Sequence, residues 1–205
     1  FIPVFEHNGF IVEVDFFVLS SIFKTIQRQI GEGRTVRPIS VNQSRASVSS
    51  PDYVKRIRSL AGQYPVPLSY IQIEVTETIL ENNSDDLSEI LLSLKNMGFS
   101  IALDDFGAGY ASLNNLKNFP VDTLKIDKEF LNDRGSSCRG RTIIRGIVNL
   151  ARELGITVVC EGVETGEQLA FLYDIGCDYA QGFYCARPMP ISEYEKVFSG
   201  NSCMA

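Results

Sequence analysis

Strand-like and helix-like segments alternate along nearly the whole chain, and this alternation limits the possible folds more than any other feature. Short apolar runs predict strands, whereas apolar residues three and four positions apart predict one face of a helix. The runs that predict strands are 36–41 (interrupted by Pro38), 70–75, 99–103, 122–126, 156–160 and 178–182. Because parallel strands need a crossover between them, this order predicts an α/β fold with βα units and a largely parallel sheet.

Helices are predicted between and around the strands from the spacing of apolar residues. The three clearest helical faces consist of Leu19, Ile22, Phe23, Ile26 and Ile30, of Leu87, Ile90, Leu91 and Leu94, and of Ile143, Ile147, Leu150, Ala151 and Leu154. Glycines at 31, 98 and 155 are expected to end these helices. Thr165-x-x-Gln168 and Ser192-x-x-Glu195 have the pattern of capping boxes, which open helices.

Alternation alone fits both a closed barrel and an open, doubly wound sheet. A dinucleotide-binding sheet is disfavoured, because no glycine-rich fingerprint follows the first predicted strand. A closed barrel of βα units has eight strands and usually roughly 250 residues, whereas this chain has 205 residues and six predicted strands. Either the sheet is open, or the chain begins after the barrel does.

Composition excludes several classes of function. The formal net charge is −6 and the basic residues are scattered, which disfavours a nucleic acid polymer as partner. No apolar run is long enough for a membrane segment. The five cysteines are odd in number and form no C-x-x-C pair, so we expect reduced thiols and a cytoplasmic location. With His7 as the single histidine, any catalytic metal must be held by oxygen atoms.

Polar side chains lie at or just after the end of every predicted strand. Asp104 and Asp105 come directly after the apolar run 99–103, and adjacent carboxylates repel unless a cation shares the site. The whole set is Asn42, Glu74, Glu77, Asp104, Asp105, Lys125, Asp127, Glu161, Glu164 and Gln181. In a parallel barrel the carboxyl ends of the strands meet on one face. Oxygen ligands of this kind suit Mg²⁺ or Mn²⁺, and two such ions clamp a phosphoryl group for attack by water.

The same residues resemble the ordered motif series of EAL-domain cyclic-di-GMP phosphodiesterases. The motifs are Ser40-Val41-Asn42-Gln43-Ser44, Glu74-Val75-Thr76-Glu77, Leu103-Asp104-Asp105-Phe106-Gly107-Ala108-Gly109-Tyr110, Leu124-Lys125-Ile126-Asp127, Glu161-Gly162-Val163-Glu164-Thr165, Ala180-Gln181-Gly182-Phe183 and the closing Arg187-Pro188. The resemblance predicts a domain over 1–198, followed by a C-terminal tail, 199–205.

The resemblance implies a TIM-type (β/α) barrel that cleaves cyclic-di-GMP to linear pGpG with two Mg²⁺ or Mn²⁺ ions. Asn42, Glu74 and Asp104 would then be metal ligands, and Asp104 would bridge to a second ion held by Asp105. Lys125 would position the phosphate or the attacking water, Glu161 would be the general base or a ligand acting through that water, and Gln181 would orient the water.

The remaining matched residues would act around this centre. Glu77 would anchor the loop after Asp105, in which Gly107 and Gly109 permit tight turns, and Glu164 would support the site from behind. Arg187 and Pro188 would contact the substrate. The resemblance also suggests a homodimer, and fusion to or regulation by a sensor or diguanylate cyclase domain. In that case the chain would be cytoplasmic or the cytoplasmic part of a membrane-bound sensor.

The chain departs from the family at its beginning. No Glu-Ala-Leu occurs in the 205 residues, and the first two strands of the family's barrel have no counterpart. The missing glutamate would be a metal ligand. The chain is therefore either a truncated piece of an active domain, which we favour because the other motifs are complete, or an inactive cyclic-di-GMP receptor or protein-interaction module. An unrelated open α/β domain with acidic strand ends is the third hypothesis.

Overall fold

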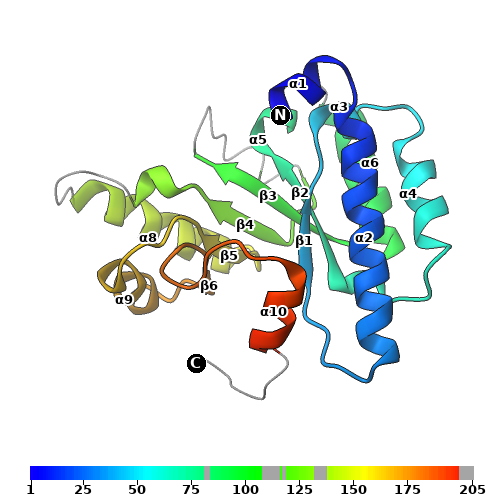
Figure 1. Ribbon diagram of the computed structural model, residues 1–205. Helices are drawn as coiled ribbons and strands as arrows, with labels where there is room; N and C mark the ends of the chain where they lie inside the picture. The colour runs from blue at the N-terminus through cyan, green and yellow to red at the C-terminus, as the bar shows by residue number, and fades with distance from the viewer. Residues whose placement is uncertain (81–83, 108–115, 117–118, 132–137, 199–205) are drawn as a thin grey trace.

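A six-stranded parallel sheet organises the protein. The computed structural model describes residues 1–205 apart from 81–83, 108–115, 117–118, 132–137 and 199–205 (Figure 1). The strands are β1 (Ile39–Asn42), β2 (Ile71–Thr76), β3 (Ser100–Phe106), β4 (Thr123–Ile126), β5 (Thr157–Cys160) and β6 (Tyr179–Ala180). Their order in the sheet is the order in the chain, and every neighbouring pair is parallel. The sheet curls into a partial TIM-type barrel, which confirms the predicted fold class.

Two strands, β1 and β6, are shorter than predicted by two residues or more. β1 begins at Ile39, directly after Pro38, because proline has no N–H to offer the ladder. β6 has two residues only, Tyr179 and Ala180, and the chain then turns at Gly182. A Cβ at residue 182 would overlap the backbone of Val163, so this close approach requires glycine.

Helices precede, connect and follow the strands. They are α1 (Ile2–His7), α2 (Ile11–Gly31), α3 (Arg45–Val48), α4 (Tyr53–Ala61), α5 (Glu77–Leu80), α6 (Ser84–Met97), α8 (Cys138–Glu153), α9 (Gly166–Asp174) and α10 (Ile191–Phe198), with 3₁₀ turns η1 (Leu68–Tyr70) and η2 (Lys128–Phe130). Within the described ranges, no helix combines the length and the apolar character that a membrane crossing requires.

The core lies between the sheet and the helices that cover it. Leu19, Phe23 and Ile26 of α2 are fully buried, as are Leu91 and Leu94 of α6, in agreement with the predicted faces, whereas Ile30, predicted on the α2 face, is 41% exposed. They belong to one apolar cluster with the strand residues Ile73, Ile101, Leu103 and Leu124. Burial of this apolar area is the main favourable contribution to folding.

The predicted face of α8 is wrong by about one residue. Ile143 and Leu154 are about half exposed, at 47% and 51%, whereas Ile144, Val148 and Ala151 are buried. These three residues keep the i, i+4, i+7 spacing of a single helical face. Apolar residues adjoin one another at 143–144 and 147–148, so their spacing alone did not show which face of the helix is buried.

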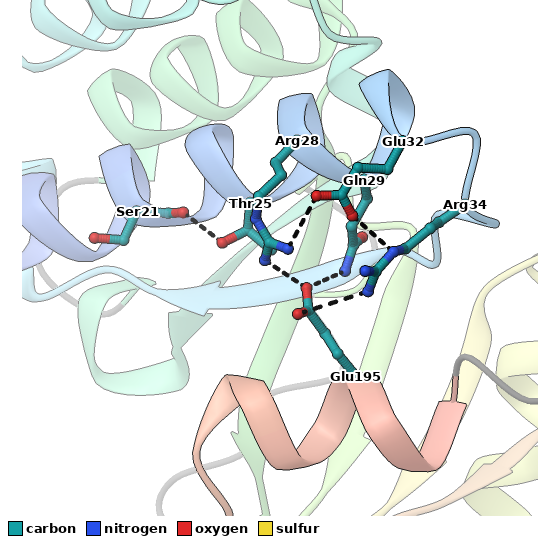
Figure 2. A network of polar contacts seen from close by, with 7 residues as sticks. All are labelled: Ser21, Thr25, Arg28, Gln29, Glu32, Arg34 and Glu195. Carbon is teal, nitrogen blue, oxygen red and sulfur yellow. Dashed lines mark hydrogen bonds and ion pairs between the residues drawn. The ribbon is translucent and has the colours of Figure 1, made fainter.

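The two predicted capping boxes have different outcomes. Thr165 and Gln168 form the box that opens α9, with reciprocal bonds of 3.2 and 3.0 Å. The second box is wrong, because Ser192 and Glu195 both lie inside α10. The Glu195 carboxylate turns to α2 instead, as Figure 2 shows.

Glu195 joins the two sides of the partial barrel. Its carboxylate accepts from Arg28 Nη2 at 2.6 Å and from Gln29 Nε2 at 3.2 Å, and Arg34 Nη1 lies 3.8 Å away (Figure 2). The hydrogen bond from Arg28 holds the pKa of the Glu195 carboxyl below its usual value. We call these four residues the α2–α10 junction. It ties the helix after β6, one sheet edge, to the helix before β1, the other edge (Figure 1).

Replacing Glu195 by alanine should release α10 locally. The change leaves the Arg28 and Arg34 guanidiniums without the carboxylate, so amides of α10 should exchange hydrogen faster while the thermal midpoint of the domain changes little. Hydrogen exchange read by mass spectrometry measures this. Glu193→Ala, at an exposed position of the same helix, is the matched control, and equal exchange in both variants would contradict the assigned role of the junction.

Candidate active site

Lys125 lies at the centre of a cluster of carboxylates at the carboxyl edge of the sheet. Its Nζ is 2.6 Å from Glu161 Oε1, 2.9 Å from Asp104 Oδ1 and 3.0 Å from Glu74 Oε2. These residues come from the ends of β2, β3, β4 and β5, four neighbours in a parallel sheet. Lys125 and Glu74 are each only 5% exposed. The prediction that strand ends converge on one face is thereby confirmed for these four residues.

Asn42 brings a further oxygen to the same place. Its amide lies 3.2 Å from Glu74 Oε2 and 3.3 Å from Asp104 Oδ2, and with the NH₂ group turned toward them it donates a hydrogen bond to each. A half-turn of the amide would instead present its oxygen at the same place, and three converging oxygens are favourable only around a cation. Asn42, Glu74 and Asp104 therefore fit a divalent cation.

A second group of oxygens shares Asp104. One carboxylate oxygen from each of Asp104, Asp105 and Glu161 lies within 4.8 Å of the other two, close enough to hold a metal ion. Asp105 has a φ of +55°, a conformation that costs a residue with a side chain on the order of 1 kcal/mol or more. Its N–H donates to Asp104 Oδ1 at 3.0 Å. Adjacent side chains of a regular strand point to opposite faces, whereas at this irregular backbone the carboxylates of Asp104 and Asp105 both reach one site.

The electrostatics of the cluster are unbalanced. Burial raises the pKa of the Glu74 carboxyl, and burial together with the Asp104 charge raises the pKa of Asp105. Burial alone would lower the pKa of Lys125, but the hydrogen bond with Glu161 and the Glu74 charge prevail and raise it. One ammonium thus faces four carboxylates, from Glu74, Asp104, Asp105 and Glu161. The excess negative charge favours a bound cation.

The other predicted residues lie farther from this centre or outside the described ranges. Glu77 is buried at the start of α5, directly after β2. Glu164 is exposed, and its N–H donates to Gln168. Gly109 falls outside the described residues. The roles predicted for these three residues stay predictions.

Gln181, Arg187 and Pro188 come together in a separate groove. The groove has a volume of about 660 Å³ and is bounded by α2, β1 and α10. Arg187 lies over the Phe183 ring, 4.8 Å from its centroid. Among the residues that the structure describes, no carboxylate of the Lys125 cluster lines this groove. Gln181 also lines a second cavity, of about 650 Å³, together with Ser40, Gln72 and Thr123, so it borders both spaces.

Comparison with known proteins identifies the family. The model of the EAL domain matches residues 1–188. The chain belongs to the EAL domain family. Cyclic di-GMP phosphodiesterase NbdA of Pseudomonas aeruginosa is 34% identical over 196 residues, which are 96% of this chain and 25% of that protein. Cyclic di-GMP phosphodiesterase RocR of the same species is 37% identical over 163 residues, 80% of this chain and 42% of that protein.

A solved structure agrees with this assignment. The structure described as the PaMucR phosphodiesterase in complex with c-di-GMP has a TM-score of 0.89 and 35% identity, and the alignment covers 95% of this chain and 78% of that one. The chain spans about a quarter of the length of the first curated relatives that it matches, which include signaling protein YkoW of Bacillus subtilis at 32% identity over 96% of this chain and 24% of that protein.

Sequence reasoning missed a polar layer beneath the acidic cluster of this EAL domain. Ser40 Oγ donates to Gln72 Oε1 at 2.9 Å, and Gln72 Nε2 donates to Thr123 Oγ1 at 2.8 Å. Each of these residues stands two positions before Asn42, Glu74 or Lys125 on the same strand. Because side chains alternate along a strand, the inner face could have been extended from the site residues by counting back two.

Replacing Gly107 by alanine should destabilise the EAL domain by roughly 1–3 kcal/mol. Gly107 has a φ of +94°, and a Cβ there would overlap the Phe130 ring. Denaturant unfolding measures the change. Gly146→Ala is the control, because Gly146 lies within α8 with open space around it. Alanine at this position should raise the free energy of unfolding by about 1 kcal/mol. A neutral or stabilising Gly107→Ala would contradict the described turn.

Replacing Lys125 by methionine should cost about 3–5 kcal/mol in metal-free protein, because buried carboxylates lose their cation. The carboxylate pKa values then rise further in the folded state, so the deficit should shrink as pH falls from 7 to 5. Mn²⁺ should restore more stability to the variant than to the wild type. Lys95→Met is the control, since Lys95 pairs with Asp122 near the surface. A deficit independent of pH and Mn²⁺ would contradict this electrostatic account.

Proposed function

We propose that this EAL domain is a metal-dependent phosphodiesterase that hydrolyses cyclic-di-GMP to linear pGpG in bacterial second-messenger signalling. The observation that carries the proposal is the convergence of Glu74, Asp104 and Glu161 on Lys125, with Asn42 and Asp105 beside them. The relatives NbdA and RocR, which are named as cyclic di-GMP phosphodiesterases, support the same reaction.

In this proposal the site binds two Mg²⁺ or Mn²⁺ ions through its oxygen ligands. Asn42, Glu74 and Asp104 would hold one ion, and Asp104 with Asp105 would hold the other. When bound, such ions supply positive charge to the phosphoryl oxygens and lower the pKa of water. Five oxygen-bearing side chains without histidine or cysteine are the donor set that these ions prefer.

The protein's own residues then orient and deprotonate the nucleophile. Lys125 Nζ donates to a phosphate oxygen or to the attacking water, and Gln181 orients that water. Glu161 accepts the water proton as general base. The water oxygen bonds to phosphorus, the bond from phosphorus to O3′ breaks, and the released O3′ takes a proton. The product is the linear dinucleotide with a 5′-phosphate.

Other matched residues support this arrangement in the proposal. Arg187 and Pro188 bind the dinucleotide from the neighbouring groove. Glu77 anchors the loop after Asp105, with Gly107 and Gly109 as its turns, and Glu164 supports Glu161 from outside the site. The wider setting would be a cytoplasmic domain, or the cytoplasmic part of a membrane-bound sensor. There it would be joined to or regulated by a sensor or diguanylate cyclase domain, and it would form a homodimer.

Hydrolysis of cyclic-di-GMP tests the proposal directly. The protein, with its upstream residues included, should form linear pGpG in the presence of Mn²⁺, and excess chelator should abolish turnover. Asp104→Asn should lower kcat by at least roughly 10²–10³-fold, because the shared carboxylate charge is lost. Asp122→Asn, at the amino end of β4, is the matched control. Product formation that is insensitive to chelator, or unchanged in Asp104→Asn, would refute the proposal.

A catalytically inactive cyclic-di-GMP receptor is the second candidate function. A receptor would bind the nucleotide by calorimetry with or without chelator and release no product. Binding that requires the metal would favour the enzyme instead.

A further inference from the structure

A buried carboxylate on α2 holds the segment that follows Asn42. Asp15 is 8% exposed, and its Oδ2 accepts from the Ser44 backbone N–H at 2.8 Å and from Ser47 Oγ at 2.6 Å. Ser44 is the N-cap of α3 and stands two residues after Asn42. Asp15 therefore fixes the backbone where the chain leaves the candidate metal site.

A second buried side chain holds the same segment from the opposite helix. The Tyr53 hydroxyl on α4 donates to Gln43 Oε1 at 3.1 Å, and Gln43 Nε2 donates to the Asn42 carbonyl oxygen at 2.9 Å. The Gln43 N–H donates to the Glu74 carbonyl oxygen at 2.9 Å. Gln43 and Tyr53 are 2% and 1% exposed. This chain of bonds leads from α4 to the backbone of Asn42 and, through the ladder, to that of Glu74.

We propose that Asp15 and Tyr53 are positioning residues that set the place of the Asn42 amide relative to Glu74 and Asp104. This inference rests on the proposed metal-dependent function. Burying an ionised carboxylate opposes folding unless it is fully hydrogen-bonded, and an apolar residue would fill the same place on α2 without that penalty. The hydrogen bonds of a buried carboxylate are useful where a backbone segment must be held in one position.

The geometry of Asn42 explains why such precision matters. The Asn42 amide is 3.2–3.3 Å from oxygens of Glu74 and Asp104, so a small shift of β1 would separate the three side chains. Metal sites require ligands held within about 0.5 Å of the productive geometry. Residues that orient ligands through hydrogen bonds change metal affinity by about 10–100-fold when they are removed.

A purely structural role would have a different signature. If Asp15 only fastened α3 to α2, its loss would lower stability and leave the affinity for metal unchanged in the folded protein. Asp122 provides the comparison, because its carboxylate likewise accepts a backbone N–H, from Ile101 at 2.9 Å, and a side-chain bond, from Lys95 at 2.6 Å. Asp122 lies directly before β4, at the end of that strand away from the candidate metal site.

The test measures free Mn²⁺ by electron paramagnetic resonance during titration of the protein with its upstream residues included. Asp15→Ala should weaken Mn²⁺ binding about tenfold or more, and Asp15→Asn, whose amide oxygen still accepts both bonds, should stay within about threefold of the wild type. Asp122→Ala should lower the unfolding midpoint without changing the affinity. All titrations are made at a temperature well below each variant's thermal unfolding midpoint.

Tyr53→Phe keeps the ring and removes only the bond to Gln43, so it decides the matter if Asp15→Ala does not fold. It should weaken Mn²⁺ binding severalfold. If folded Asp15→Ala binds Mn²⁺ with wild-type affinity, the inference is wrong and the proposed function stands. If Asp15→Ala does not fold, wild-type Mn²⁺ affinity in folded Tyr53→Phe has the same meaning. Absence of Mn²⁺ binding by the wild type refutes the metal site itself, and the inference with it.

Discussion

One ammonium group among buried carboxylates is the interaction on which the candidate site depends. Lys125 lies within 3.0 Å of oxygens from three strands, and each of these carboxylates would be unfavourable in its place without that charge. The parallel sheet makes the arrangement possible, because it delivers the ends of β2, β3, β4 and β5 to one edge in register. The candidate site therefore depends both on the parallel sheet, which brings these residues together, and on the Lys125 charge, which compensates their carboxylates.

The Lys125 charge is insufficient by itself, and this insufficiency points to a cation. One ammonium faces four carboxylates, so the cluster keeps an excess of negative charge even where the Asn42 amide donates to Glu74 and Asp104. The polar layer of Ser40, Gln72 and Thr123 beneath the cluster supplies hydrogen bonds but no charge. The interior of the partial barrel is consequently polar near its carboxyl edge, whereas the core lies outside the sheet, under α2, α6 and α8.

The strand ends could be predicted from sequence because a polar residue at or just after the end of a short apolar run is a local signal. Asn42, Glu74, Asp104, Lys125 and Glu161 are each found in this way, and parallel pairing then brings them together. The phase of α8 could not be predicted, since apolar residues at 143–144 fit either face and only packing selects one. The network of Asp15 was also out of reach, because its partners lie 29 and 32 residues away and their pairing depends on how α2 crosses β1. Glu195 was misassigned for the same reason, as its partner Arg28 is 167 residues away.

The α2–α10 junction has a consequence for how the domain folds. Its two sides are separated by 167 residues, so the loop that it closes is nearly as long as the chain. Contacts of such separation are entropically expensive and form late. Arg28 and Gln29 precede Glu195 by more than 160 residues, with all six strands between them. During synthesis the junction can therefore form only after every strand of this sheet has been made.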